Sequence, residues 1–234
     1  MGPFRHLILT RFNVRLPEHR PRGKDWLPHR FRFFERFCLP SVRSQSHRNF
    51  DWVVFFDAAT PKEFVDRIQQ CRELGAFQPV YVDGHFTQGT VQKAVSPLIA
   101  GCEHVITTRL DNDDAICRDF VAVIQDHFAS QKFTFLNFTH GYVWHRNDLY
   151  RVRHLSNSFI SLVEQTGNVS TVFAGNHMHL SALGPVQQIP KPAAWMQVVH
   201  DRNLMNEVWG APCPIQELRG SFEIDPECLG LLPG

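Results

Sequence analysis

A cluster of acidic residues beside an arginine is the part of the sequence whose residue types are best suited to chemistry. Residues 109–115 read RLDNDDA and follow an apolar segment, ending near Thr108, that is typical of a buried strand. Three carboxylates within four residues repel one another unless a cation lies among them, and such hard oxygen ligands suit Mg²⁺ or Mn²⁺. A bound cation would neutralise a diphosphate and the charge that develops when it leaves. The cluster therefore predicts a metal or diphosphate site.

The same residues also allow a purely structural interpretation. Asp111 and Asn112 could form a turn, while Asp113 or Asp114 could cap a helix that begins near Ala115. One aspartate is enough for a helix cap. The presence of three carboxylates therefore favours the metal or diphosphate site.

Apolar runs alternate with helical patterns along the first 139 residues, and these elements must position the cluster. The expected strands are 6–12, 50–56, 79–82, 102–110 and 132–138. The expected helices are 31–45, with a bend at Pro40, then 61–75, 88–100 and 120–128. This alternation predicts an α/β fold with a mainly parallel sheet and helices on both faces. In such folds ligands bind at the carboxyl ends of the strands, where the acidic cluster lies.

The pattern changes beyond residue 140. Residues 142–144 and 149–155 are expected to pair as a hairpin. Further elements are expected as a helix at 157–165, a strand at 171–173 and a helix or helix-like segment at 195–206. The tail from Gly210 is rich in proline and glycine, so we expect an irregular C-terminal segment. No linker demands a boundary, which favours a single domain of 1–234.

The composition excludes a disordered or collagen-like chain. Of the 234 residues, 43% are hydrophobic and 20 are phenylalanine, so the chain can bury a sizeable core. The net charge of +1 offers no argument for nucleic acid as a partner. The charge is unevenly distributed, because residues 1–50 carry 11 Lys and Arg against three acids. We therefore expect an N-terminal segment that faces anions and a later segment rich in carboxylates.

Cysteine spacing and hydropathy favour a cytoplasmic protein. The six cysteines have no CxxC or CxxH spacing that would build a zinc site, so reduced thiols are expected. The apolar stretch of residues 7–9 is too short for the core of a signal peptide or for a membrane span. The basic residues between 15 and 24 could still touch an anionic carrier or a membrane surface, so peripheral contact with the membrane stays open.

Several segments resemble the bacterial family labelled "putative rhamnosyl transferases", which are glycosyltransferases of the GT-A type. They are LTRFNV, FCLPSVRSQ, NFDWVVFFD, TTRLDNDDA, NSFISLVE and WMQVVHDRN, and they extend from about residue 7 to residue 206. The order of strand, helix and strand ending at Asp57, followed by a D-x-D after a later strand, is similar to the nucleotide-sugar-binding half of GT-A enzymes. The resemblance implies a GT-A-like domain with a nucleotide-sugar-binding half at 1–139, an acceptor-side half at 140–210 and a tail at 211–234.

The resemblance also implies which residues hold the metal and the nucleotide. Asp111 and Asp113 take the places of the D-x-D aspartates, which bridge the ribose and the metal-diphosphate group, and Asp114 is a candidate helper. A late histidine completes the metal coordination in many members, and His200 occupies that place. At the nucleoside, the first strand end places Thr10 and Arg11 near the nucleotide, and Asp57 is the acid that contacts the base.

The roles of two arginines and the identity of the catalytic base stay open at this point. Arg11 and Arg109 could hold phosphate oxygens through their planar forks, or they could form salt bridges to the neighbouring carboxylates. Inverting transfer needs a group that takes the proton of the acceptor hydroxyl. By their order along the chain Glu164 and His177 are the candidates for this base, with Asp201 as a further one.

The implied activity is transfer of a sugar from a nucleoside diphosphate donor to a hydroxyl acceptor with Mg²⁺ or Mn²⁺. The donor would be a dTDP-, UDP- or GDP-sugar, with dTDP-rhamnose as the first candidate, and the acceptor a glycan or a lipid-linked molecule. A sugar-phosphate nucleotidyltransferase is an alternative, but it should carry a glycine-rich loop after the first strand, where Gly23 is the single glycine. A second alternative is a catalytically inactive binding module, which would bind the nucleotide without transferring the sugar.

Overall fold

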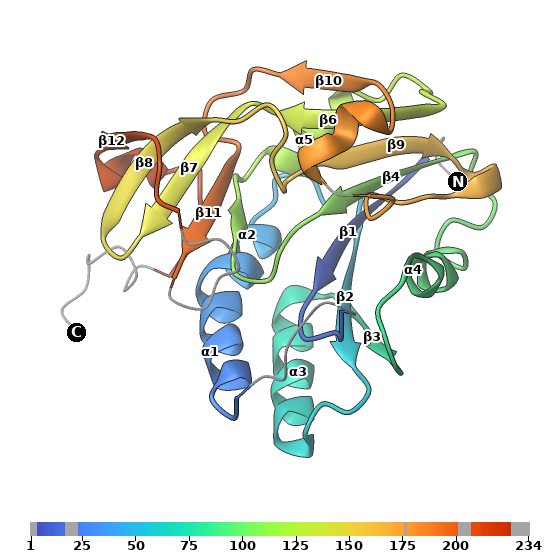
Figure 1. The fold of residues 1–234 in the computed structure, drawn as a ribbon, viewed down its shortest axis with the longest axis horizontal. Coiled ribbons are helices and arrows are strands. Elements are labelled where there is room, and N and C mark those ends of the chain that lie inside the picture. Colours follow the sequence, from blue (N-terminus) through green and yellow to red (C-terminus); the bar gives the residue numbers. More distant parts are fainter. Residues whose placement is uncertain (1–3, 17–22, 176, 201–206, 226–234) are drawn as a thin grey trace.

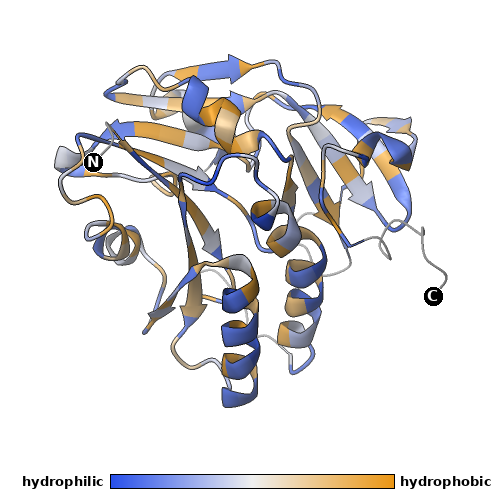
Figure 2. Ribbon diagram, turned by 180° about the vertical axis from the view of Figure 1, so that it is seen from behind, coloured by the Kyte–Doolittle hydropathy of each residue, from blue (hydrophilic) through white to orange (hydrophobic). Residues whose placement is uncertain are grey.

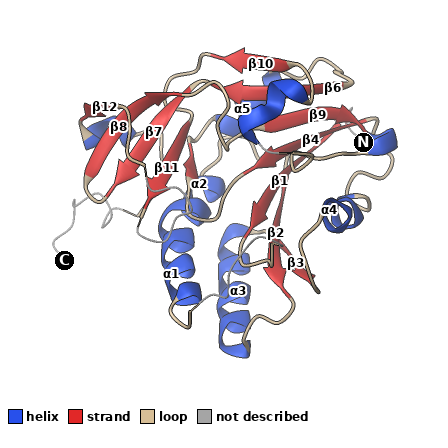
Figure 3. Ribbon diagram, viewed as in Figure 1, coloured by secondary structure: helices blue, strands red, loops and turns tan. Residues whose placement is uncertain are grey.

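Two β-sheets and the helices that cover them make up the fold (Figures 1 and 3). The computed structural model describes residues 4–16, 23–175, 177–200 and 207–225. The larger sheet has seven strands in the order β10-β6-β9-β4-β1-β2-β3. Their bounds are β10 Val186–Ile189, β6 Phe133–Phe138, β9 Ser161–Gln165, β4 His104–Arg109, β1 Phe4–Arg11, β2 Asp51–Asp57 and β3 Gln78–Val82. All of them are parallel except β9, which runs antiparallel to both β4 and β6.

Helices cover both faces of the larger sheet, as the sequence predicts. Alternate residues of each strand point to opposite faces, so Ile8 joins one apolar cluster and Leu7 joins another. The cluster around Ile8 takes in side chains from four helices: α1 Trp26–Phe33, α2 Leu39–Arg43, α3 Lys62–Gly75 and α5 Phe120–Asp126. The cluster around Leu7 takes in α4 Gln88–Val95. Figure 2 shows polar and apolar residues alternating along the helices, as expected where one side of each helix packs on the sheet.

Pro40 changes the helix that carries the phenylalanine stripe. A π-helical turn, Phe34–Cys38, separates α1 from α2, and the Leu39 N–H donates to the carbonyl of Phe34. Because proline has no N–H, the carbonyl of Arg36 lacks its helical donor. The backbone N–H of Asp225 donates to that carbonyl at 2.9 Å. The missing N–H of Pro40 therefore leaves a carbonyl to which the C-terminal part of the chain attaches.

The second sheet is formed mostly by residues beyond 139 and has the order β12-β8-β7-β11-β5. Its strands are β12 Ala211–Cys213, β8 Asp148–Arg153, β7 His140–His145, β11 Trp195–Val199 and β5 Ala115–Ile116. The predicted hairpin is confirmed as β7 and β8. Because β5 comes directly after the acidic cluster and pairs with β11, the cluster lies where the two sheets meet. The later half of the chain is thus more regular than the sequence indicates.

Four sequence expectations for local structure are wrong. Residues 157–165 contain β9 rather than a helix, and residues 171–173 form a turn rather than a strand. The segment from Trp195 is β11 rather than a helix up to Val199, and residues 201–206 lie outside the described part. No helix begins at Ala115, where β5 starts. For β9 and β11 the cause of the error is that both strands are buried on both faces. Their sequences therefore lack the alternation of polar and apolar residues that distinguishes a strand from a helix.

Gly141 of β7 leaves room for the ring of Trp195, which lies opposite it on the neighbouring strand β11. A Cβ atom at this position would lie 2.2 Å from the Trp195 ring, whose Nε1–H donates to the carbonyl of Phe138. We expect Gly141→Ala to lower the free energy of unfolding by about 1–3 kcal/mol, because the buried ring must move. Chemical denaturation measures the change. Gly167→Ala is the matched control, since nothing lies within 4 Å of its Cβ position, and equal losses in the two variants would contradict the packing argument.

The cysteines in the described part of the chain are free thiols, in agreement with the expected absence of disulfides there. They are Cys38, Cys71, Cys102, Cys117 and Cys213, whereas Cys228 lies outside the described residues. Within the same ranges, the helices are too short or too polar to cross a bilayer.

Candidate functional site

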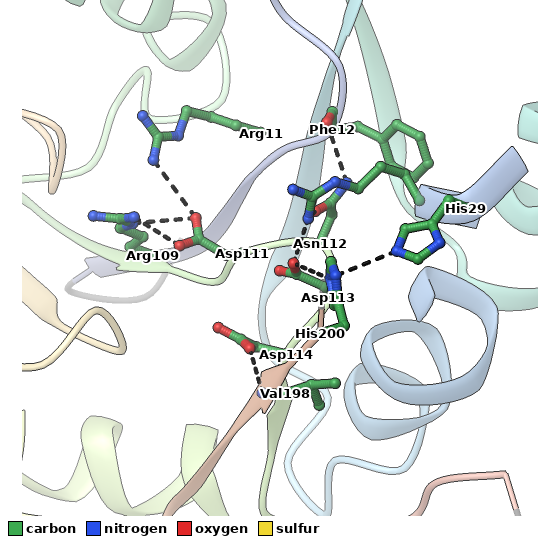
Figure 4. A network of polar contacts seen from close by, with 11 residues as sticks. Arg11, Phe12, His29, Arg109, Asp111, Asn112, Asp113, Asp114, Val198 and His200 are labelled. Carbon is green, nitrogen blue, oxygen red and sulfur yellow. Dashed lines mark hydrogen bonds and ion pairs between the residues drawn. The ribbon is translucent and has the colours of Figure 1, made fainter. Parts of the chain in front are cut away.

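A pocket of about 240 Å³ lies at the carboxyl ends of β1 and β4, over the acidic cluster. The two strands are parallel neighbours with Leu9 opposite Arg109, so the residues that follow each strand meet at one edge of the sheet. Three arginines and three aspartates contribute to the lining (Figure 4). The lining residues are Arg11, Phe12, Leu16, Trp26, Arg30, Arg109, Asp111, Asn112, Asp113, Asp114, Ser158, His177 and Gln197.

Asp111 is held by two arginines. Arg109 forks onto its carboxylate with Nη2–Oδ2 and Nε–Oδ1 distances of 2.6 and 3.3 Å, and the Arg11 Nη2 lies 3.6 Å from Oδ1. Burial alone would raise the pKa of Asp111, but the charges of Arg109 and Arg11 outweigh it and hold the pKa below its usual range. The salt-bridge alternative for both arginines is therefore realised. Their positions on the pocket wall also leave them available to phosphate oxygens.

Asp113 lies at the centre of a chain of polar contacts. Arg30 of α1 forms a short ion pair with its Oδ2, and the His200 Nε2 lies 3.1 Å from the same oxygen. Since the carboxylate accepts, His200 Nε2 donates, and its Nδ1 lies 3.2 Å from Nε2 of His29 (Figure 4). The His200 ring also stacks on Phe33, with ring centroids 4.1 Å apart. The structure thus brings Asp113 and His200, two of the three residues predicted as metal ligands, into direct contact, although His200 lies behind Asp113 rather than in the pocket lining.

Asp114 and Asn112 connect the cluster to the two sheets. The Asp114 Oδ1 accepts from the backbone N–H of Val198 in β11 at 2.9 Å, and the Asn112 amide donates to the carbonyl of Phe12 at 3.1 Å (Figure 4). Burial, together with the neighbouring charges of Asp113 and Asp111, raises the pKa of Asp114 well above its usual range. These two side chains hold the loop in place, and the carboxylates of Asp111 and Asp113 are the ones that pair with arginines. The cap interpretation does not apply, because no helix begins at the cluster.

His177 lies in the pocket but does not present a basic nitrogen there. The Arg109 Nη1 donates to its Nδ1 at 2.8 Å. A guanidinium can only donate, so Nδ1 uses its lone pair in this contact and the neutral ring carries its proton on Nε2. Burial, and then the charge of Arg109, lower the pKa of His177 to about 4, which keeps the ring neutral. His177 therefore offers an N–H to a ligand, which argues against its predicted role as the base.

Asp57 and Thr10, which were expected near the nucleoside together with Arg11, differ in their surroundings. Asp57 ends β2, and its carboxylate accepts two hydrogen bonds from Arg15 at 2.7 and 2.9 Å. The Thr10 side chain is 0% exposed, and its hydroxyl accepts from the indole N–H of Trp52 at 2.9 Å. Thr10 thus points into the core and not into the pocket, because its position on β1 places it on the face covered by α1 and α3.

Glu164 does not lie near the acidic cluster, which contradicts its predicted role as the base. It belongs to β9 opposite Val105, whereas Arg109 is at the other end of β4, and four residues of strand span about 13 Å. Its buried carboxylate accepts from the backbone N–H groups of Ser170 and Thr171 at 2.7 and 2.8 Å. Burial raises its pKa against the lowering effect of these two donors. The error follows from the helix expected at 157–165, which is an antiparallel strand that carries residue 164 to the far edge.

Glu164→Gln is expected to affect stability and not ligand binding. The substituted amide would turn an N–H₂ group toward one of the two buried backbone donors, which costs about 1–3 kcal/mol of unfolding free energy. Denaturation measures the loss, and a nucleotide titration should be unchanged. Glu103→Gln, an exposed change just before β4, is the control. If a folded Glu164→Gln protein no longer bound nucleotide, Glu164 would belong to the binding site, which contradicts its purely structural role.

Sequence reasoning missed several residues of the pocket. Arg30 and Trp26 come from the helix whose phenylalanine stripe was assigned to the core, and the Arg30 guanidinium lies 5.2 Å from the Trp26 ring centroid. The spacing of four residues on one helix was available in the sequence as a sign that the two share a face. Ser158 and Gln197 come from segments that were expected to be helical, so no signal placed them at the strand ends. Asp201 falls outside the described residues.

The pocket can supply oxygen ligands for a hard cation, but not a complete shell. Within the described residues, no three His, Cys, Asp or Glu side chains converge as a ligand set. Mg²⁺ is commonly held by one or two carboxylates together with substrate phosphates and water. Asp111 and Asp113 fit that pattern, because both carboxylates line the pocket and both pair with arginines. The donor set therefore suits a cation that binds together with a diphosphate.

Solved structures with a similar outline share little sequence with this chain. S. aureus TarS has 12% identity and a TM-score of 0.48, over 83% of this chain and 37% of TarS. The TarS 1-349 structure in complex with UDP has 12% identity and a TM-score of 0.47, over 83% and 60%. A "putative nucleotide-diphospho-sugar transferase" from Desulfovibrio desulfuricans G20 has 10% identity and a TM-score of 0.45, over 83% and 82%. Likeness at this level does not assign a function, and the chain spans well under two thirds of the length of TarS.

The sequence itself matches one family over most of its length. No curated protein matches the chain significantly. The family described as "Putative rhamnosyl transferase" matches residues 22–212, which include the acidic cluster, Arg30, His177 and His200. This chain therefore belongs to the family described as "Putative rhamnosyl transferase".

Proposed function

We propose that the protein transfers a sugar from a nucleoside diphosphate donor to a hydroxyl acceptor, with Mg²⁺ or Mn²⁺ as the cofactor. The observation that carries the proposal is the convergence of three arginines and three aspartates in one pocket at the carboxyl ends of β1 and β4. A pocket with both signs of charge suits a ligand that brings phosphates and a divalent cation together. Rhamnose, the sugar in the family description, is the first candidate for transfer.

Arg11 and Arg109 would bind the diphosphate. Both guanidinium groups now contact Asp111, and their planar forks match phosphate oxygens equally well. When the sugar–phosphate bond breaks, negative charge accumulates on the departing phosphate, and donors that are already in position stabilise it. The Nε2–H of His177 would add a third donor, because Arg109 fixes its tautomer.

Asp111, Asp113 and His200 would hold the cation. Bound there, the cation would neutralise the diphosphate and the charge that develops on it as the leaving group. Arg30 forms an ion pair with Asp113 and balances its charge. His200 now donates to Asp113, so it would act as a ligand only after losing its Nε2 proton. Until then it orients the Asp113 carboxylate, and Asp114 supports the loop from behind.

Asp57 and Arg11 would lie toward the nucleoside. Asp57 ends the strand next to β1, and its pairing with Arg15 holds the carboxylate at that edge of the sheet. Thr10 supports the neighbouring Trp52 rather than the nucleotide. Residues from about 140 onward would shape the acceptor side. The donor would be a dTDP-, UDP- or GDP-sugar and the acceptor a glycan or a lipid-linked molecule, in a cytoplasmic enzyme that contacts the membrane peripherally through its basic segment.

Thermal unfolding with nucleotides tests the proposal. We expect UDP, GDP or TDP with Mn²⁺ to raise the Tm, because a ligand that binds only the folded protein stabilises it. Mn²⁺ alone should have a smaller effect, since phosphate oxygens complete its shell. AMP with Mn²⁺ serves as a control for unspecific nucleotide binding. If none of the three diphosphates raises the Tm, the donor site is not where we place it.

A further inference from the structure

A second pocket opens beside the first one and shares a wall with it. Its volume is about 450 Å³, within the usual range of about 300–1,000 Å³ for sites that bind small molecules. Ser158, His177 and Gln197 line both pockets, so a molecule in the second pocket would face the diphosphate end of the donor site. None of the residues that form the rest of this pocket has a role in the donor site.

An exposed tryptophan gives this second pocket an apolar surface of the kind that sugar rings stack against. Trp209 is 37% exposed, and its ring lies with its edge toward His154 at a centroid distance of 5.4 Å. The buried pair of Phe159 and Trp195, stacked at 5.0 Å, lies against the same pocket. Aromatic surface beside polar groups such as Ser158 and Gln197 suits a ligand with an apolar face and hydroxyl edges. A pyranose ring has that character.

Both histidines of the second pocket have their basic nitrogen already occupied. The Nδ1 of His177 accepts from Arg109, and the Nδ1 of His154 accepts from the backbone N–H of Ser156 at 3.0 Å. Guanidinium and amide groups only donate, so each neutral ring carries its proton on Nε2. Neither ring can take a proton from a hydroxyl in this arrangement.

Glu207 provides the proton acceptor that the two histidines cannot provide. It is exposed, and it is the acidic side chain among the described residues that line the second pocket. We propose that this pocket binds the acceptor as a sugar ring on Trp209 and that Glu207 accepts the proton of the acceptor hydroxyl. The inference rests on the proposed function and adds to it the acceptor class, a glycan end, and the base.

The reaction then balances as a direct displacement. The acceptor oxygen forms a bond to the anomeric carbon while its proton moves to the Glu207 carboxylate. The bond between the anomeric carbon and the phosphate oxygen breaks, and its electron pair leaves with the nucleoside diphosphate, toward Arg11 and Arg109. A displacement of this kind inverts the anomeric configuration, as it does where a carboxylate acts as general base in inverting enzymes.

Binding and transfer are measured with simple glycosides. The probes are the 4-nitrophenyl glycosides of glucose, galactose, N-acetylglucosamine and rhamnose. Their binding is measured by saturation-transfer NMR in the presence of UDP and Mg²⁺, which is diamagnetic, and transfer is measured with UDP-glucose or dTDP-rhamnose as the donor. Trp209→Ala should weaken binding of the glycosides about three- to tenfold, and Trp209→Phe should restore most of it. Glu207→Gln should leave glycoside binding intact and slow transfer by about 100- to 10,000-fold. Glu207→Asp should be faster than Glu207→Gln.

The controls separate this inference from the proposed function. Glu223→Gln changes a surface glutamate that pairs with Arg118 and should affect neither measurement. Failure of every nucleotide to raise the Tm would contradict the donor site, whereas an intact rise in the Glu207 and Trp209 variants shows that only the acceptor site has changed. Any of four results would overturn the inference: no glycoside binds, binding ignores Trp209→Ala, bound glycosides give no product or a retained one, or Glu207→Gln transfers at the normal rate.

Discussion

Replacing Arg109 by alanine is expected to slow the release of nucleoside diphosphate from a sugar nucleotide by about 100- to 1,000-fold. Arg109 contacts Asp111 with two nitrogens and fixes His177 with a third, so the change removes a phosphate donor and releases two neighbours. A coupled assay for the released diphosphate measures the rate.

Two further arginine variants serve as comparisons for Arg109→Ala. Arg109→Lys keeps the charge but loses the planar fork, and we expect a rate between those of the wild type and Arg109→Ala. Arg118→Ala removes an exposed arginine that pairs with Glu223 on the surface, so its rate should match the wild type. A folded Arg109→Ala protein with an unchanged rate would show that the diphosphate does not bind at Asp111.

Asp113→Asn is expected to abolish most of the stabilisation by nucleotide with Mn²⁺ and to reduce turnover by about 100- to 1,000-fold. The amide still offers one oxygen to Arg30 and so preserves much of the packing, but it no longer provides a charged ligand for a cation. Calorimetric titration with each nucleoside diphosphate, with Mn²⁺ and after its removal by EDTA, measures the effect. EDTA should reproduce the loss in the wild-type protein.

Asp113→Ala and an exposed aspartate serve as comparisons. The alanine variant leaves Arg30 and His200 without their shared partner, so its lower Tm would reflect structure as well as binding. Asp126→Ala, an exposed change at the end of α5, should bind nucleotide normally. If Asp113→Asn bound the nucleotide with Mn²⁺ as tightly as the wild type does, Asp113 would not be a ligand of the cation.

The fold of the first 139 residues could be predicted because its apolar runs are bounded by clear signals. The run 50–56 is apolar almost throughout and ends at Asp57, and the structure confirms it as β2. Between these strands the helical spacing is equally clear, as for the residues that form α3. Parallel strands alternating with helices then leave few topologies, so the position of the acidic cluster at the strand ends follows from the sequence.

The later half could not be predicted to the same extent, because its pairing is not local. β9 is inserted between β4 and β6, which come earlier in the chain, and nothing within Ser161–Gln165 specifies those neighbours. The same holds for β11, which lies between β7 and β5. Without these pairings, Glu164 could not be excluded from the site by its distance along β4.

The acidic residues of the candidate site, together with Arg11 and Arg109, were predictable from the sequence, whereas Arg30 was not. Asp111, Asp113 and Asp114 are adjacent in sequence, so their grouping needs no knowledge of the fold. Arg30 and Asp113 are 83 positions apart, and only the packing of α1 against the strand ends brings them together. The hydrogen bond that Arg109 donates to Nδ1 of His177 is likewise an atomic contact that the residue types do not reveal.

A crystal structure with Mn²⁺ and the nucleoside diphosphate that raises the Tm most tests the central claim most directly. We predict that the phosphate groups lie within hydrogen-bond distance of Arg11 and Arg109 and that Mn²⁺ bridges them to Asp111 and Asp113. Arg30 should then have moved off Asp113 to make room for the cation. A nucleotide bound elsewhere on the protein, with Arg30 and Asp113 still paired, would contradict the account.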